Sequence, residues 1–256
     1  MNYVTVSSPL ATQIPQASGS GYQYRITKQD RIAVTYFGEG AASEGDFHAA
    51  LNFAATLRSQ TLFICRNNMY AISTPVDDQL VGDGIAARGV GYGMHTIRVD
   101  GNDALAIYAA VKEARRLIIA EKKPALIELI SYRVGDHSTS DFSERYRDEN
   151  EMKKWNSLIK NFSNPISRLD AYLVSKNWIK PDHQAAIRDD AKKQVRDALK
   201  KAADEKLPPI EELFTDVYDA PHPDLIEQQK ELEAHLRRHP DAYGLEKFVG
   251  GEKFMA

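Results

Sequence analysis

Residues 31–73 have the sequence RIAVTYFGEGAASEGDFHAALNFAATLRSQTLFICRNNMYAIS. The first apolar run, Ile32 to Phe37, is typical of a buried strand and stops at Gly38. Residues 47–57 place apolar side chains along one helical face. A second apolar run, Thr61 to Cys65, follows that segment. A helix that joins two short apolar strands predicts a βαβ unit with parallel, neighbouring strands.

Polar residues follow both predicted strands. Glu39 comes directly after the first strand, and Asn68 and Tyr70 follow the second. Ligands of open α/β sheets bind at the carboxyl ends of the strands, so these residues are expected to face one crevice. A carboxylate, an amide oxygen and a backbone carbonyl suit Mg²⁺ together with phosphate oxygens. Gly40 and Ala41 allow backbone N–H groups to approach a diphosphate closely.

A second βαβ unit is predicted further along the chain. His95 to Val99 and Ala125 to Tyr132 are expected strands, and residues 104–121 between them are an expected helix with Asn102 or Asp103 as its N-cap. The two units together predict one continuous parallel sheet, and therefore an α/β fold. Residues 74–92 are expected to form a loop, because they contain Pro75 and several glycines.

The chain changes to helical patterns from residue 148. Amphipathic helices are expected over residues 148–160, 165–176 and 181–206 and in a last helix after Pro223. The tail from His239 is expected to be loosely held, or ordered only against a partner. The sequence therefore predicts an α/β domain over residues 1–147 and a helical C-terminal region over residues 148–256. We expect the helical region to pack on that domain and on a partner subunit.

The segment GEGAASEGD, followed by a helix and then by NN, resembles the thiamine diphosphate motif, which in most members of that family begins with GDG. The wider chain resembles the α subunit of the branched-chain 2-oxo acid dehydrogenase E1 component. The matching stretches cover most of residues 1–170 in order: MNYVTVSSPLATQIPQA, YFGEGAASEGD, NFAATL, RNNMYAISTP, GDGIAARG, RVDGND, SYRVGDHSTSD and NPISRL. The motif alone is weak, whereas the ordered set is specific.

The resemblance implies a thiamine diphosphate-binding fold and a function. The family decarboxylates 2-oxo acids oxidatively and passes the acyl group to a lipoyl group on the E2 partner. An E1 β subunit would complete an α2β2 heterotetramer, and a kinase and phosphatase would regulate it in the mitochondrial matrix. Without its β subunit the chain is expected to be inactive.

The resemblance also implies roles for individual residues. Thiamine diphosphate contacts would be Ser8, Leu10, Gly38, Gly40, Ala41, Arg66 and His137. Mg²⁺ ligands would be Glu39, Asn68 and Tyr70. K⁺ ligands would be Ser7, Pro9, Thr12 and Gln13. From composition alone, the segment at residues 7–13 is better explained as a turn closed by local side-chain hydrogen bonds.

A polar loop, Arg133 to Asp141, follows the last predicted strand and is expected to face the same crevice. Its His137 carries an imidazole suited to proton transfer near neutral pH, and the resemblance assigns it to the acyl-transfer step. The family often has a second histidine where this chain has Asp136. Ser138 matches a regulatory phosphorylation position, and Asp148 replaces a second one.

Composition limits the alternatives. The chain has 256 residues, a formal net charge of −3, 43% hydrophobic residues and one cysteine. It therefore shows no basic footprint for nucleic acid, no apolar run of membrane-spanning length and no disulfide framework. Its start has the pattern of neither a signal nor a transit peptide, so the mitochondrial prediction rests on the resemblance.

Three other interpretations remain open at this stage. Chains of the resembling family carry a long segment before the position of Met1, so a fragment, a truncated isoform or an incomplete gene model is expected. A truncated isoform that binds the β subunit without catalysing is one alternative. A pyruvate- or acetoin-specific relative is another. A plain Mg²⁺-nucleotide domain is disfavoured, because neither GxGxxG nor GxxxxGK[ST] occurs.

Overall fold

The structure of the chain is a computed structural model that describes residues 3–158 and 164–254. The chain divides into two compact units, Met1–Ile179 and Lys180–Ala256. We call them the sheet unit and the C-terminal unit, and each is described by itself.

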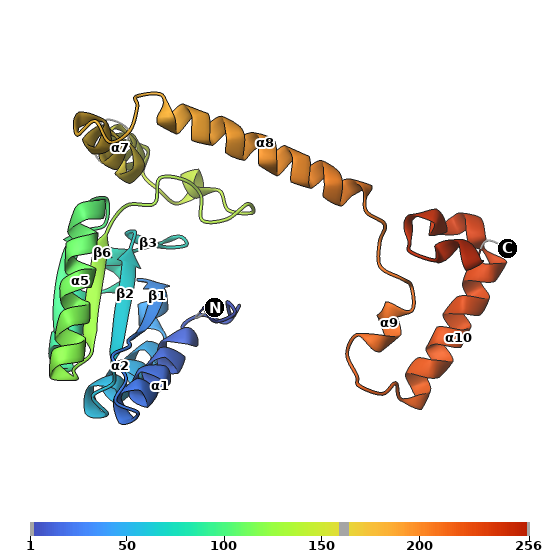
Figure 1. Cartoon of the computed structure of the whole chain (residues 1–256), viewed down its shortest axis with the longest axis horizontal. Coiled ribbons are helices and arrows are strands. Elements are labelled where there is room, and N and C mark those ends of the chain that lie inside the picture. Colours follow the sequence, from blue (N-terminus) through green and yellow to red (C-terminus); the bar gives the residue numbers. More distant parts are fainter. Residues whose placement is uncertain (1–2, 159–163, 255–256) are drawn as a thin grey trace. The chain divides into compact units, whose positions relative to one another are not determined.

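A four-stranded sheet forms the centre of the sheet unit (Figure 1). The strand order is β1 (Ala33–Gly38), β2 (Thr61–Asn67), β6 (Ala125–Ile130) and β5 (His95–Asp100). All three neighbouring pairs are parallel. The predicted α/β class, both βαβ units and the single parallel sheet are therefore confirmed.

Helices cover both faces of this sheet. Helices α1 (Gln13–Ile26) and α2 (Gly45–Thr56) lie on one face, and α5 (Ala104–Glu121) lies on the other (Figure 1). Side chains of β2 alternate between the faces, with Phe63 and Cys65 in the α1–α2 core and Leu62 and Ile64 in the α5 core. Because both faces of the sheet are covered, successive side chains of a strand are apolar, which explains the continuous apolar runs in the sequence. Cys65, the one cysteine of the chain, is fully buried and packs in the α1–α2 core as a small residue.

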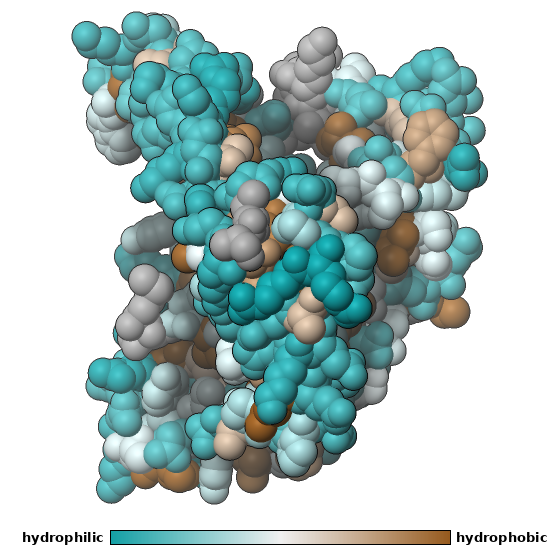
Figure 2. Space-filling model, turned by 90° about the vertical axis from the view of Figure 1, so that its right-hand side faces the viewer, coloured by the Kyte–Doolittle hydropathy of each residue, from teal (hydrophilic) through white to brown (hydrophobic). Residues whose placement is uncertain are grey.

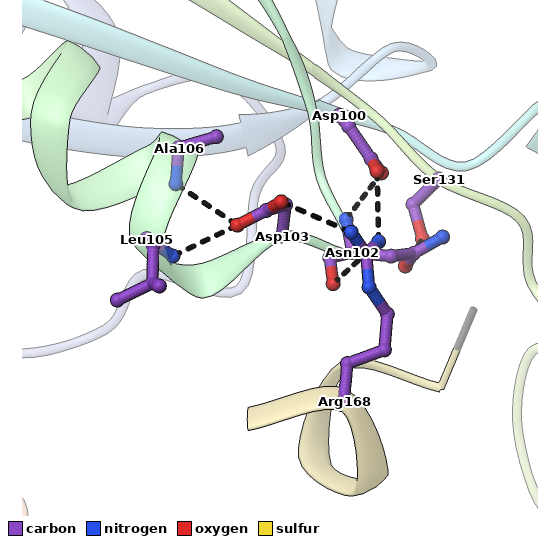
Figure 3. A network of polar contacts seen from close by, with 7 residues as sticks. All are labelled: Asp100, Asn102, Asp103, Leu105, Ala106, Ser131 and Arg168. Carbon is purple, nitrogen blue, oxygen red and sulfur yellow. Dashed lines mark hydrogen bonds and ion pairs between the residues drawn. The ribbon is translucent and has the colours of Figure 1, made fainter. Parts of the chain in front are cut away.

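Asp103 is the N-cap of α5, one of the two residues predicted for this role. Its Oδ1 accepts hydrogen bonds from the backbone N–H groups of Leu105 and Ala106, each at 3.0 Å (Figure 3). These bonds satisfy two of the N–H groups that a helix start leaves unpaired. The helix ends at Lys122, whose φ of 52° places it in the left-handed region.

The expectation of a plain loop over residues 74–92 was wrong. A two-stranded antiparallel hairpin, β3 (Tyr70–Ala71) and β4 (Thr74–Pro75), is followed by two short helices, α3 (Val76–Gln79) and α4 (Ala86–Gly91). The buried side chain of Glu128 accepts the first backbone N–H groups of α4 and thereby fixes its start. Local composition could not show this contact, because Glu128 is more than forty residues away.

Two further helices belong to the sheet unit, namely α6 (Glu149–Leu158) and α7 (Pro165–Ser175). Figure 3 shows Arg168 of α7 reaching the turn between β5 and α5, where it bonds Asp100 at 2.8 Å and Asp103 at 3.0 Å. The compact unit therefore extends to Ile179, beyond the division expected at residues 147 and 148. Residues 159 and 160 of the helix expected over 148–160 lie outside the described residues.

The described N-terminal residues form no strand. Residues 3–6 are exposed and have no regular structure, and Asn2 lies outside the described residues.

The C-terminal unit is helical, as predicted. It contains α8 (His183–Asp204), α9 (Glu212–Thr215) and α10 (Pro223–Arg238), followed by 3₁₀ turns at Pro240–Ala242, Leu245–Lys247 and Gly251–Phe254. The expectation of a loosely held tail was wrong. Leu245 and Phe254 of the tail are each 1% exposed and pack with Leu236 of α10. The sequence did not reveal this packing, because the few apolar residues of the tail lie among many polar ones.

The face of the molecule shown in Figure 2 is mainly polar. On the face shown in Figure 2, hydrophobic side chains form small separate patches in a largely hydrophilic surface. Within the described residues, no helix is both long and apolar enough to cross a membrane.

Candidate functional site

The parallel register brings several strand ends to one edge of the sheet. Gly38 of β1 lies opposite Arg66 of β2, and Asn67 of β2 lies opposite Ile130 of β6. The chain beyond β6 stays beside β2, since Ser131 N donates to Asn67 O at 2.8 Å and Arg133 N donates to Asn68 O at 3.2 Å. The segments after β1, β2 and β6 therefore meet at this edge, as the sequence predicted.

Glu39, Asn68 and Tyr70 are brought together there. Glu39 is 1% exposed, and its Oε2 accepts the backbone N–H of Asn68 at 3.1 Å. The Asn68 Oδ1 atom accepts the backbone N–H of Tyr70 at 3.2 Å. No ion pair to Glu39 occurs within the described residues. A buried carboxylate without a cation is unfavourable, so this position fits a metal ion.

The chemistry of the donors also fits Mg²⁺. No cluster of three His, Cys, Asp or Glu side chains occurs in the part of the chain that the structure describes. A metal at Glu39 therefore depends on amide and carbonyl oxygens as further ligands. Hard oxygen donors of this kind, few in number and combined with phosphate oxygens, suit Mg²⁺.

The residues predicted to contact a diphosphate lie beside Glu39. Arg66 is exposed at the sheet edge, and its guanidinium has no hydrogen bond or ion pair within the described residues. A Cβ added to Gly40 would lie 2.9 Å from the Cβ of Ala71, so only glycine fits against the hairpin there. Ala41 is buried and begins a 3₁₀ turn, Ala41–Ser43. The free guanidinium and the short turn suit an anionic group.

We call Glu39, Asn68 and Tyr70 the Glu39 group. The segment at residues 7–13 has fewer contacts to the rest of the site than this group has. Thr12 Oγ1 donates to Pro9 O at 3.3 Å, which is the local bond expected of a turn. Gln13 Nε2 donates to Tyr36 O at 3.0 Å and ties this segment to β1. Three further predicted contact residues, Ser7, Ser8 and Leu10, are exposed. No hydrogen bond joins these three side chains to the Glu39 group in the described structure.

The loop that carries His137 is closed by two aspartates. Asp141 Oδ2 accepts the backbone N–H of His137 at 2.7 Å and the hydroxyl of Tyr146 at 2.6 Å. Asp136 Oδ1 accepts the hydroxyl and the backbone N–H of Ser143, at 2.5 and 2.9 Å. The Ser143 bonds hold the pKa of the Asp136 carboxyl below its usual value, and the bonds from Tyr146 and His137 do the same for the pKa of Asp141.

His137 and Ser138 lie on the outside of this loop. Both are exposed, and the Ser138 hydroxyl contacts only the Ser140 hydroxyl, at 3.4 Å, among the described residues. The His137 imidazole makes no hydrogen bond to the Glu39 group in the described structure. The loop therefore leaves the imidazole and the hydroxyl accessible.

Sequence reasoning missed the arginines that join this loop to the Glu39 group. Arg133 is 9% exposed and donates to Tyr70 O at 3.4 Å, to Ile72 O at 2.6 Å and to the Tyr146 hydroxyl at 2.7 Å. Arg147 donates to Arg133 O at 2.6 Å, and its guanidinium lies 4.8 Å from the centre of the Tyr70 ring. Because the partners are separated by up to 77 residues along the chain, no local pattern could reveal them.

Tyr70 is fixed from its hydroxyl end as well. Glu151 of α6 accepts the Tyr70 hydroxyl at 2.9 Å and the Tyr132 hydroxyl at 3.2 Å. Burial, together with the hydrogen bond to Glu151, raises the pKa of Tyr70 to about 12. Trp155 stacks on Tyr132 with ring centres 4.8 Å apart. Tyr70 is therefore fixed at its carbonyl by Arg133 and at its hydroxyl by Glu151.

A second carboxylate, Glu128 of β6, is fully buried below this edge. It accepts hydrogen bonds from Asn67 Nδ2 at 2.9 Å, Ile85 N at 3.1 Å, Ala86 N at 2.8 Å and Arg98 Nε at 3.1 Å. Burial alone would raise the pKa of Glu128, but these donors outweigh it and hold the pKa below the ordinary value.

Comparisons with known proteins identify the family of this chain. The sequence matches the family described as dehydrogenase E1 component over residues 1–211. The chain is 53% identical to the mitochondrial 2-oxoisovalerate dehydrogenase subunit alpha of Dictyostelium discoideum over 256 residues, which is 100% of this chain and 57% of that protein.

Two further relatives give the same result. Identity to the human subunit of the same name is 49% over 96% of this chain and 55% of that protein. Identity to subunit alpha 2 of Arabidopsis thaliana is 47% over 95% of this chain and 51% of that protein. The chain thus spans about half the length of the curated relatives that it matches.

The lowered pKa of Glu128 predicts a dependence of stability on pH. A carboxyl whose pKa is lower in the folded state stabilises the fold above its unfolded pKa, and this contribution is lost as the pH falls. We expect the free energy of unfolding to decrease as the pH falls below about 4.5, the ordinary value for glutamate. Urea denaturation of the wild type and of Glu128→Gln at pH 7 and pH 4 measures this contribution.

In that comparison, the Gln variant should be less stable at pH 7 and should lose less stability on acidification than the wild type. Equal losses in both proteins would contradict the role assigned to Glu128, because other lowered carboxyl groups, such as Asp100, are unchanged in the variant.

Proposed function

The chain belongs to the dehydrogenase E1 component family, and on that premise we propose that it is the α subunit of a thiamine diphosphate-dependent dehydrogenase of branched-chain 2-oxo acids. The reaction would be oxidative decarboxylation, in which the lipoyl disulfide of E2 is the oxidant and is reduced as it accepts the acyl group. The observation that carries the proposal is the buried Glu39 carboxylate, which has no ion pair in the described structure and bonds the turn that carries Asn68 and Tyr70.

This chain would supply the metal and diphosphate half of the cofactor site. The Glu39 carboxylate, the Asn68 amide oxygen and the Tyr70 carbonyl would hold Mg²⁺. Arg66 supports the diphosphate assignment, because its exposed guanidinium has no other partner in the described residues and can donate several hydrogen bonds. Gly38, Gly40 and Ala41 would leave room for the anion, and Ser8 and Leu10 would add contacts to the cofactor.

Thiamine diphosphate, held on this chain by residues such as Arg66 and Gly40, would supply the nucleophile and the electron sink that decarboxylation of a 2-oxo acid requires. The chain's own contribution to acyl transfer would come from His137, which is exposed on a loop that Asp136 and Asp141 hold in shape. An accessible imidazole can act as a general acid or base. Acyl transfer to a lipoyl sulfur needs such a proton donor beside the acceptor.

The names of the relatives support the wider assignment. They are called mitochondrial subunits alpha, so we propose that this chain acts in the mitochondrial matrix with an E1 β subunit, in an α2β2 assembly with E2. We further propose K⁺ binding by Ser7, Pro9, Thr12 and Gln13, and regulation at Ser138 by a kinase and a phosphatase. The C-terminal region, residues 148–256, would contribute contacts to the β subunit.

A non-catalytic role in the complex is a second candidate. Such a chain would occupy the β subunit without turnover. Co-expression with the β subunit and an assay of 2-oxo acid decarboxylation separates the two. A stable but inert complex in the presence of thiamine diphosphate and Mg²⁺ would favour the non-catalytic candidate.

Glu39→Ala tests the metal assignment. In the assembly with the β subunit, we expect Mg²⁺-dependent affinity for thiamine diphosphate to fall by more than about 100-fold, since loss of outer partners alone costs about 10- to 100-fold. Isothermal titration calorimetry measures this affinity. Glu44→Ala is the matched control, because Glu44 is an exposed carboxylate five residues further on. Unchanged affinity in Glu39→Ala would refute the metal site.

Ser138→Glu tests the regulatory role of the loop. Phosphorylation adds about −1.5 to −2 charges, and here the charge would lie between Asp136 and Asp141, which already close the loop. We expect the overall rate of acyl transfer to fall by at least about tenfold, because small displacements of a catalytic group can cost about 100-fold. Ser138→Ala should remain within twofold of the wild type. Wild-type turnover by the Glu variant would contradict the regulatory assignment.

The substrate class is tested by comparing 3-methyl-2-oxobutanoate with pyruvate in the assembled enzyme. We expect kcat/KM for the branched substrate to be higher by about tenfold or more, because each added methyl group in a fitted apolar pocket is worth about 1–3 kcal/mol. A preference for pyruvate would transfer the proposal to a pyruvate-specific relative while leaving the cofactor assignment intact.

A further inference from the structure

Asn67 connects the Asn68–Tyr70 turn to a buried carboxylate. Its Nδ2 donates to Glu128 Oε1 at 2.9 Å, and its Oδ1 accepts the backbone N–H of Met69 at 3.1 Å. Asn67 is 3% exposed and Glu128 is fully buried. Both ends of the Asn67 side chain are therefore engaged, one on β6 and one on the turn.

Glu128 is itself held from two other elements. The backbone N–H groups of Ile85 and Ala86 at the start of α4 donate to its two oxygens, and Arg98 Nε of β5 donates to Oε2. Arg98 is in turn fixed by Asp83, at 2.9 Å. Because these donors fix both carboxylate oxygens, Asn67 is oriented by a rigid group rather than by a mobile side chain.

The turn that Asn67 braces contains a strained residue. Met69 has a φ of 72°, in the left-handed region that side chains with a Cβ rarely adopt. Such a conformation persists where surrounding contacts determine it. The hydrogen bond from Met69 N to Asn67 Oδ1 falls on the strained residue, directly between Asn68 and Tyr70.

We propose that Asn67, oriented by Glu128, is a positioning residue for the divalent cation, because it fixes the turn that presents the Asn68 amide oxygen and the Tyr70 carbonyl. The inference rests on the proposed function, which takes those two groups as ligands of Mg²⁺. Neither Asn67 nor Glu128 hydrogen-bonds the Glu39 carboxylate in the described structure, so both act on the cation through the turn.

The test compares Asn67→Ala with Asp83→Asn in the assembly with the β subunit. Asn67→Ala removes the brace, whereas Asp83→Asn alters the outer, exposed end of the same network and leaves Asn67 on Glu128. Mg²⁺ is titrated at fixed thiamine diphosphate, and cofactor binding is measured by calorimetry. We expect the Mg²⁺ midpoint to rise by about tenfold or more in Asn67→Ala and to stay within twofold of the wild type in Asp83→Asn.

A purely structural role for Asn67 would lower the melting temperature without moving the Mg²⁺ midpoint, and that result would overturn the inference. Should Asn67→Ala fail to assemble, Glu128→Gln serves the same purpose. It keeps the side-chain volume but can place an amide N–H against Asn67 Nδ2, so its midpoint should also rise. A wild-type midpoint in an assembled Glu128→Gln complex would equally overturn the inference.

Glu39→Ala in the same titration separates this inference from the proposed function. Loss of Mg²⁺ dependence in Glu39→Ala, with a wild-type midpoint in Asn67→Ala, would reject only the positioning role. Wild-type behaviour in both variants would reject the cation site itself, and the positioning role with it.

Discussion

The parallel register of β1, β2 and β6 is the constraint on which the rest of the sheet unit depends. It sets Gly38 opposite Arg66 and Asn67 opposite Ile130, so the chain leaves all three strands at one edge. Because side chains alternate between the faces, a slip of one residue would move Phe63 and Cys65 out of one core and Leu62 and Ile64 out of the other. The same slip would separate Glu39 from Asn68. The apolar cores therefore fix the position of the polar edge.

Two buried carboxylates at this edge differ in their partners, and the difference indicates their roles. Glu128 is fully buried and bonded by four donors, including Arg98, as expected of a structural carboxylate. Glu39 is almost as buried, but in the described structure its carboxylate accepts one hydrogen bond, from the Asn68 backbone N–H, and has no cation partner. Burial, followed by the charges of Glu128 and Glu39, raises the pKa of the Cys65 thiol well above its usual value. A divalent cation would compensate the charge of Glu39.

The sequence allowed the strands, the helices between them and the meeting of Glu39 with Asn68 to be predicted, because each depends on local periodicity or on the geometry of a βαβ unit. The same local reasoning limited the N-cap of α5 to Asn102 or Asp103, and the structure places it at Asp103. Contacts between distant segments could not be predicted this way. Arg133 donates to the Tyr70 carbonyl, 63 residues away in sequence. The first N–H groups of α4 donate to the Glu128 carboxylate of β6. The tail packs on α10 through Leu245 and Phe254. Each of these contacts depends on tertiary structure.

The central claim is that the sheet edge of this chain carries the divalent cation of a thiamine diphosphate site. The most direct measurement is anomalous diffraction from crystals of the assembly with the β subunit, grown with Mn²⁺ in place of Mg²⁺. The account predicts an anomalous peak about 2.0–2.2 Å from an oxygen of Glu39, the Asn68 Oδ1 atom and the Tyr70 carbonyl. Mn²⁺ bound elsewhere, with Glu39 bonded only to the Asn68 backbone N–H, would contradict it.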